Sequence, residues 1–161
     1  QRELEPPESS EGFASIEQVP FKRTWPADFV NRAAIAWCDD PEIFVSLAPA
    51  LRALADSGRV LFGLSWQPDV SAGTRSVSDI EAMFTSVKTR TGLPIEFMYC
   101  PHGPGPPRCW CRKPLPGLGV LLVHRHRLDP PQCIYFGDGP QDPAFARKLG
   151  LTLRTSSREE P

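Results

Sequence analysis

Residues 100–111 hold three cysteines and one histidine, in the pattern Cys-x-His, six residues, Cys-x-Cys. Thiolate sulfur and imidazole nitrogen are ligands that Zn²⁺ prefers, and four of them close a tetrahedral structural site. We therefore predict that Cys100, His102, Cys109 and Cys111 bind zinc as a structural cofactor. The alternative is a set of reduced surface cysteines beside an unrelated histidine. The loop is rich in proline and has few apolar side chains to fold around, which favours the metal.

The other two cysteines, Cys38 and Cys133, lie in apolar runs and are predicted to pack in the core. An odd total of five cysteines argues against a disulfide framework. The net charge of −1 creates no general attraction to nucleic acid, and no apolar run is long enough to span a bilayer. We therefore predict a soluble, cytoplasmic protein with no membrane partner.

Apolar runs alternate with amphipathic segments along the chain. The runs that predict buried strands are 32–37, 59–65, 95–100, 132–138 and 151–154. Helices are predicted at 46–58 with Ser46 as N-cap, at 78–92 with a Ser78–Glu81 capping box, from Pro116 onward, and at 141–150. Because these strands are apolar along their length, the pattern predicts an α/β fold: a doubly wound parallel sheet with helices on both faces.

Composition divides the chain into three parts. Residues 1–28 are predicted to be an arm or linker, because the segment opens acidic and proline-bearing, and 13–20 could form an edge strand. Residues 29–155 form the predicted domain, and residues 156–161 a short tail.

Polar side chains follow three of the predicted strands, at the edge of the sheet where ligands bind in such folds. They are Ser65, then Lys113 in the cysteine loop, and then Asp138, which Asp142 follows closely. Taken singly, they would be read as a capping serine, a solvated lysine and a turn aspartate.

The order of these motifs resembles the zinc-loop phosphatases of the haloacid dehalogenase superfamily, which include the heptose-bisphosphate phosphatases and the histidinol-phosphatase domain. The stretch "YCPHGPGPPRCWCRKPLPG" followed by "IYFGDGPQD" carries the resemblance, which covers roughly residues 33–155. It implies a haloacid dehalogenase-like fold with a zinc-binding loop. It also implies an aspartyl nucleophile, a proton-handling aspartate two residues later, a phosphoryl-binding Ser or Thr, a charge-neutralising Lys and a Mg²⁺-binding Asp.

Three of these parts carry over to this chain. The resemblance assigns the hydroxyl to Ser65, in "SWQ" where the family often has "TNQ", and the lysine to Lys113. It assigns the possible Mg²⁺ site to Asp138, with Asp142 as its partner.

The nucleophile does not carry over. Trp37 stands in its place, and Asp39 stands in the position of the proton-handling aspartate. Tryptophan can neither attack phosphorus nor bind Mg²⁺. The segment from Asp39 to Ser46 is also too short for the flap with which active members cover the substrate.

Three functions follow from this pattern. The first is a zinc-binding, phosphatase-like domain that lacks the aspartyl nucleophile and serves in binding or assembly, with an anion pocket around Ser65, Arg112 and Lys113. The second is an active Mg²⁺-dependent phosphomonoesterase with Asp39 or Asp40 as nucleophile, acting on a sugar phosphate or a 3′-phosphate nucleic acid end.

The third function is a nucleic-acid-end binding module attached to a polynucleotide kinase. The stretch "EPPESSEGFASIEQVPFKR" resembles the tail of such kinase domains, which implies an upstream kinase-like domain as partner. Local cations could contact phosphates, namely Arg108, Arg112, Lys113, Arg125 and Arg127.

Overall fold

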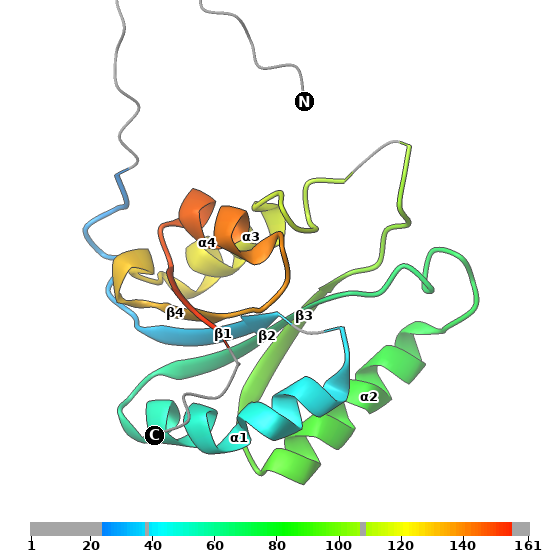
Figure 1. Ribbon diagram of the computed structural model, residues 1–161, viewed down its shortest axis with the longest axis horizontal. Helices are drawn as coiled ribbons and strands as arrows, with labels where there is room; N and C mark the ends of the chain where they lie inside the picture. The colour runs from blue at the N-terminus through cyan, green and yellow to red at the C-terminus, as the bar shows by residue number, and fades with distance from the viewer. Residues whose placement is uncertain (1–23, 38, 107–108, 156–161) are drawn as a thin grey trace, which may run out of the picture.

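Five parallel strands form one sheet in the order β3-β2-β1-β4-β5 (Figure 1). The computed structural model describes residues 24–37, 39–106 and 109–155. The strands are β1 (Ala33–Trp37), β2 (Val60–Trp66), β3 (Ile95–Cys100), β4 (Ile134–Phe136) and β5 (Thr152–Arg154). The helices are α1 (Pro41–Asp56), α2 (Val77–Thr91), α3 (Gly117–His126) and α4 (Asp142–Leu149), with a 3₁₀ turn at Pro130–Gln132.

The helices cover both faces of the sheet. In Figure 1, α1 and α2 lie below the sheet and α3 and α4 above it. Each face has its own apolar core: Phe44, Leu47 and Leu51 pack on one side, and Leu122 and Phe145 on the other. The predicted doubly wound fold is thereby confirmed.

Strand β1 runs through the middle of the sheet and is buried along its whole length. Its side chains alternate between the two cores, as the pleat of a strand requires. Ala34 and Ala36 belong to the core between the sheet and α1, whereas Ile35 and Trp37 belong to the core between the sheet and helices α3 and α4. The last residue of the strand, Trp37, therefore points toward α4 at the carboxyl edge of the sheet.

Two predicted helix starts differ from the structure. Helix α1 begins at Pro41, because the Asp40 side chain caps it by accepting from the backbone N–H of Glu42 at 2.9 Å. Ser46 lies inside the helix, where its hydroxyl donates to the carbonyl of Ile43 at 2.7 Å. Proline is favoured in the first turn, so the earlier aspartate was the stronger start signal.

Helix α2 is capped by Ser76 and Asp79, two residues before the predicted pair. The Ser76 hydroxyl accepts from the backbone N–H of Asp79 at 3.1 Å, and the Asp79 carboxylate accepts from the backbone N–H of Ser76 at 2.9 Å. A short aspartate closes the capping box here as a glutamate would.

The connection from β1 to α1 consists of residues 38–40. It has no room for a hairpin-like flap, as the sequence indicated. Cys133 is buried, as predicted. Within the part of the chain that the structure describes, no helix is long and apolar enough to cross a membrane.

Some expectations fall outside the described residues. They are most of the arm at 1–28, with its edge strand at 13–20, the tail at 156–161, and the positions Cys38 and Arg108.

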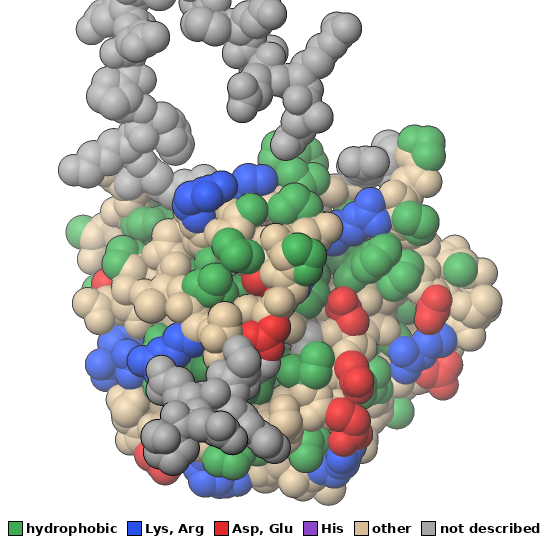
Figure 2. Space-filling view, in the orientation of Figure 1, with side chains coloured by type: hydrophobic (Ala, Val, Ile, Leu, Met, Phe, Trp, Pro, Cys, Tyr) green, Lys and Arg blue, Asp and Glu red, His purple; other side chains and the backbone are tan. Residues whose placement is uncertain are grey.

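On the face of the molecule shown in Figure 2, acidic and basic side chains are interspersed.

Candidate functional site

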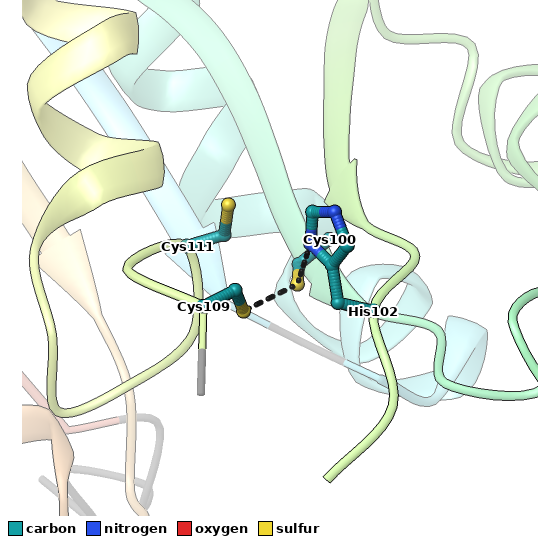
Figure 3. Close-up of side chains that lie close together, drawn as sticks. All are labelled: Cys100, His102, Cys109 and Cys111. Carbon is teal, nitrogen blue, oxygen red and sulfur yellow. Dashed lines mark hydrogen bonds between the residues drawn. The ribbon is translucent and has the colours of Figure 1, made fainter. Parts of the chain in front are cut away.

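The four predicted metal ligands converge at the end of β3 (Figure 3). Cys100 is the last residue of the strand, and the loop that follows returns Cys109 and Cys111 to it. The ligand atoms of Cys100, His102, Cys109 and Cys111 all lie within 4.8 Å of one another.

The spacing of these atoms fits one tetrahedral ion. The Sγ atoms of Cys100 and Cys109 are 3.4 Å apart, and Sγ of Cys100 lies 3.5 Å from Nδ1 of His102. Two thiolates on one zinc ion would be about 3.8 Å apart, and a thiolate and an imidazole about 3.6 Å. The cluster could therefore hold a metal ion.

The three thiols of the cluster differ in pKa. Removal from water raises the pKa of the Cys100 thiol to about 12 and also raises the pKa of Cys111. Burial acts in the same direction on Cys109, but its hydrogen bond with Cys100 and backbone N–H groups outweigh this effect and lower its pKa. Cys109 is thus the thiol most easily deprotonated for an incoming ion.

Hydrogen bonds fasten the metal loop to the sheet and to α3. The indole N–H of Trp66, at the end of β2, donates to the carbonyl of His102 at 2.7 Å. The backbone N–H of Gly117 donates to the carbonyl of Trp110 at 2.8 Å. A Cβ at Gly117 would lie 2.5 Å from that carbonyl oxygen, so glycine is needed for the close approach.

At the end of β1, the Trp37 indole lies between the core and Lys113. Its ring packs edge-on against Phe145 at 5.3 Å between centroids. The ammonium nitrogen of Lys113 lies 4.9 Å from the centroid of the Trp37 ring, a cation–π distance. An apolar ring therefore occupies the position that the resemblance gives to an aspartate.

Lys113 pairs with Asp142 instead. Its ammonium nitrogen lies 2.6 Å from Oδ1 of Asp142, whose side chain is only 2% exposed. The Tyr135 hydroxyl also donates to Oδ1, at 2.6 Å, and the backbone N–H of Gly139 donates to Oδ2 at 2.7 Å. Both carboxylate oxygens of Asp142 are thus engaged within the protein.

The backbone after β4 passes close to this carboxylate. A Cβ added at Gly137 would lie 2.5 Å from Cγ of Asp142, so a larger residue at 137 would displace the carboxylate. The "GDG" sequence therefore serves the packing of Asp142 as well as the placement of Asp138.

Comparison with known proteins finds relatives in sequence and in structure. No family model matches the chain. A D-glycero-β-D-manno-heptose-1,7-bisphosphate 7-phosphatase from Bordetella bronchiseptica is 26% identical over 128 residues, covering 75% of this chain and 71% of the relative. The enzyme of the same name from Haemophilus ducreyi is 27% identical over 139 residues, covering 80% and 76%.

Solved structures share the fold. The D,D-heptose 1,7-bisphosphate phosphatase of B. bronchiseptica, determined with magnesium and phosphate, superposes with a TM-score of 0.59 at 18% identity, over 77% of this chain and 79% of that chain. A haloacid dehalogenase-like phosphatase from Mesorhizobium loti gives 0.58 at 20% identity, over 82% and 74%. The chain has a haloacid dehalogenase-like fold. The resemblance read from the sequence is thereby confirmed.

In this haloacid dehalogenase-like fold, the two aspartates after β1 serve the local backbone. Oδ1 of Asp39 accepts from the backbone N–H of Trp66 at 2.6 Å and from the Trp37 indole N–H at 3.3 Å. Asp40 caps α1. Both residues are exposed and line the cleft at the strand ends.

Ser65 lies beneath the strand ends rather than at the surface. It is 1% exposed, donates to Oδ1 of Asp39 at 3.3 Å and accepts from the Gln67 amide at 2.6 Å. Its hydroxyl therefore takes part in an internal hydrogen-bond network, which leaves Arg112 and Lys113 as the cations of the predicted anion pocket.

Among the residues that the structure describes, two clefts lie at this edge of the sheet. The first, of about 270 Å³, is lined by Asp39, Asp138 and Lys113, among others. The second, of about 630 Å³, lies beside the metal loop, and Lys113 forms part of both linings. Among the described residues, the Cys/His cluster is the one group of three or more potential ligands, so these aspartates do not converge as it does.

Two contributors were missed in the sequence. Tyr135 looked like a core residue of an apolar strand, yet its hydroxyl holds Asp142. Trp66 was noticed only as a departure from "TNQ", yet it lines the larger cleft and anchors the metal loop. The alternation of β4, which puts Tyr135 on the α4 face, was the available signal for the first.

Proposed function

We propose that this chain is a metal-braced, phosphatase-like domain that binds a phosphate-bearing ligand without transferring its phosphoryl group. The observation that carries the proposal is the indole of Trp37 at the end of β1, with the Lys113 ammonium 4.9 Å from its ring. Indole carbon and nitrogen offer no lone pair able to attack phosphorus, so no phosphoaspartyl intermediate can form at this position.

The Lys113–Asp142 pair supports the same conclusion. In an enzyme of this type the lysine must meet charge that develops on the transferring group. Here its ammonium already has a carboxylate 2.6 Å away. A ligand anion would share the lysine with Asp142 and draw further attraction from Arg112, which suits binding better than transition-state stabilisation.

The metals have separate roles in this proposal. Zinc held by Cys100, His102, Cys109 and Cys111 would brace the loop that carries Arg112 and Lys113, as a closed four-ligand site does. Mg²⁺ could approach Asp138 and Asp39 from the smaller cleft. Asp142, the predicted partner of Asp138, would have to leave Lys113 and Tyr135 to join them.

An active phosphomonoesterase is the second candidate. The names of the curated relatives favour it, since both are heptose-bisphosphate 7-phosphatases. Asp39 would have to act as the nucleophile, because Asp40 is engaged in capping α1. A sugar phosphate would then be the substrate class.

Phosphate release separates the two candidates. Zinc-loaded protein with Mg²⁺ is incubated with a heptose bisphosphate and with p-nitrophenyl phosphate, and inorganic phosphate binding is measured by calorimetry on the same sample. We expect binding without turnover. Mg²⁺-dependent turnover that Asp39→Asn abolishes would establish the second candidate, and Glu81→Gln, on the exposed face of α2, is the matched control.

A further inference from the structure

The larger cleft is walled by aromatic rings and cations. Trp66 and Trp37 line it together with Arg112 and Lys113, and Leu115 adds apolar surface. Its volume of about 630 Å³ falls within the range of small-molecule sites. It opens beside the metal loop, which holds Arg112 in place.

The two indoles distinguish this cleft from the pattern that the sequence resembles. Trp37 stands where that pattern has an aspartate, and Trp66 stands where it often has an asparagine. Both replacements exchange a hydrogen-bonding side chain for a large planar ring, and both rings line one cleft. A ligand made of hydroxyl groups loses partners by this exchange, whereas a ligand with a flat π-system gains surface to stack on.

Arg112 is positioned to continue that planar surface. Its guanidinium carbon lies 4.8 Å from the centroid of the Trp66 ring. It also donates to the carbonyl oxygen of Pro104 at 2.7 Å, a partner without formal charge. This hydrogen bond fixes the guanidinium while leaving its positive charge available to an anion, whereas the charge of Lys113 is already shared with Asp142.

We propose that this cleft binds a nucleotide, with the base stacked on the Trp66–Arg112 pair and the phosphate held by Arg112 and Lys113. The inference rests on the proposed function, because the phosphate occupies the same cationic pocket. Aromatic rings and guanidinium planes are the surfaces on which unpaired bases stack, and such stacking is tolerant of base identity. The nucleotide could be free or the terminus of a single strand, since both present one base and one phosphate.

Quenching of tryptophan fluorescence and calorimetry measure the affinity of the zinc-loaded protein for adenosine monophosphate and ribose 5-phosphate. The second compound keeps the phosphate and the sugar but lacks the base. We expect adenosine monophosphate to bind about 10-fold more tightly or better, as one stacking contact provides. Trp66→Ala should bring the two affinities together, and Arg112→Ala should weaken both.

Trp110→Ala is the matched control, because Trp110 is exposed on the same loop and does not line the cleft. Equal affinities for the two compounds in the unaltered protein, or a loss with Trp110→Ala in place of Trp66→Ala, would overturn the nucleotide inference and leave the phosphate pocket standing. If inorganic phosphate, ribose 5-phosphate and adenosine monophosphate all fail to bind, the proposed function fails with it.

A third arm identifies the source of the nucleotide. A tetrathymidylate with a terminal phosphate is compared with thymidine monophosphate at low and moderate salt. Tighter binding of the oligonucleotide, with a steeper dependence on salt, assigns a nucleic acid end. Tighter binding of the mononucleotide assigns a free nucleotide, and either result supports the inference.

Discussion

The ammonium nitrogen of Lys113 lies 4.9 Å from the centroid of the Trp37 ring and 2.6 Å from Oδ1 of Asp142. Lysine and indole are thus direct neighbours where the resemblance places a lysine and an aspartate. The positive charge is balanced by a residue from α4 rather than from β1. Ligand binding must therefore compete with an internal ion pair.

Removal of the lysine charge should destabilise the domain. Lys113→Met leaves the carboxylate of Asp142, which is almost fully buried, without its cationic partner. Loss of one member of a buried pair typically costs about 3 kcal/mol. We expect a decrease of this order in the free energy of unfolding, measured by urea denaturation at pH 7.

A double variant tests the cause of that loss. Lys113→Met combined with Asp142→Asn removes both charges and should recover part of the stability, since the amide can still meet Tyr135 and Gly139. Lys88→Met, at an exposed position of α2, is the control and should change stability by less than about 0.5 kcal/mol. A single variant as stable as the control would contradict the assigned role of the pair.

Metal content should depend on the cysteines of the loop. Cys109→Ser exchanges a ligand thiolate for a hydroxyl without opening a core cavity, because Cys109 is only partly buried. Elemental analysis should find about one zinc per chain before the change and much less after it. A zinc ion present at 100 times its dissociation constant adds about 2.7 kcal/mol to the free energy of unfolding. Loss of this zinc should therefore lower the melting temperature by roughly 5–10 °C. Cys133→Ala, outside the cluster, should keep the zinc.

Zinc affinity should increase with pH. Burial raises the pKa of Cys100 to about 12, so near neutral pH this thiol is protonated in the metal-free protein and must lose its proton when zinc binds. Each bound ion therefore releases protons, and the apparent affinity should rise steadily from pH 6 to pH 8. Competition with a chromophoric chelator measures it. An affinity independent of pH would show that Cys100 is not a ligand.

The stability that the buried Cys133 provides should decrease at alkaline pH. Burial raises the pKa of its thiol to about 11, whereas an unfolded cysteine titrates near 8.5. A raised pKa in the folded state adds to the free energy of unfolding at any pH below the unfolded-state pKa. This stabilisation, about 3 kcal/mol in total here, is lost as the pH rises toward the folded-state pKa. The stability advantage of the unaltered protein over Cys133→Ala should thus shrink between pH 8.5 and pH 10.5, as followed by urea unfolding.

The sheet was predictable because its strands are apolar throughout and alternate with helices. The metal cluster was equally predictable, since Cys-x-His and Cys-x-Cys pairs separated by a short loop can close around one ion. Both inferences depend on residue type and spacing along the chain. The start of α1 differs from the prediction because Asp40, a candidate nucleophile in the sequence, serves as the N-cap.

The side-chain pairs at the strand ends could not be predicted from the sequence. The pairing of Lys113 with Asp142 joins residues 29 positions apart, and nothing local marks Asp142 as the partner. Ser65 was predicted to face a ligand, but the register of β2 beside β1 places it against Asp39. Such choices depend on which side chains face each other across the folded sheet.

The short connection at residues 38–40 has a kinetic consequence. Because α1 starts directly after it, this segment supplies no movable cover for the mouth formed by Trp66, Arg112 and Lys113. A ligand can then enter and leave without waiting for a closing step from this side, and its residence time is set by the contacts it makes. Stopped-flow traces should accordingly show one exponential phase whose rate rises linearly with ligand concentration.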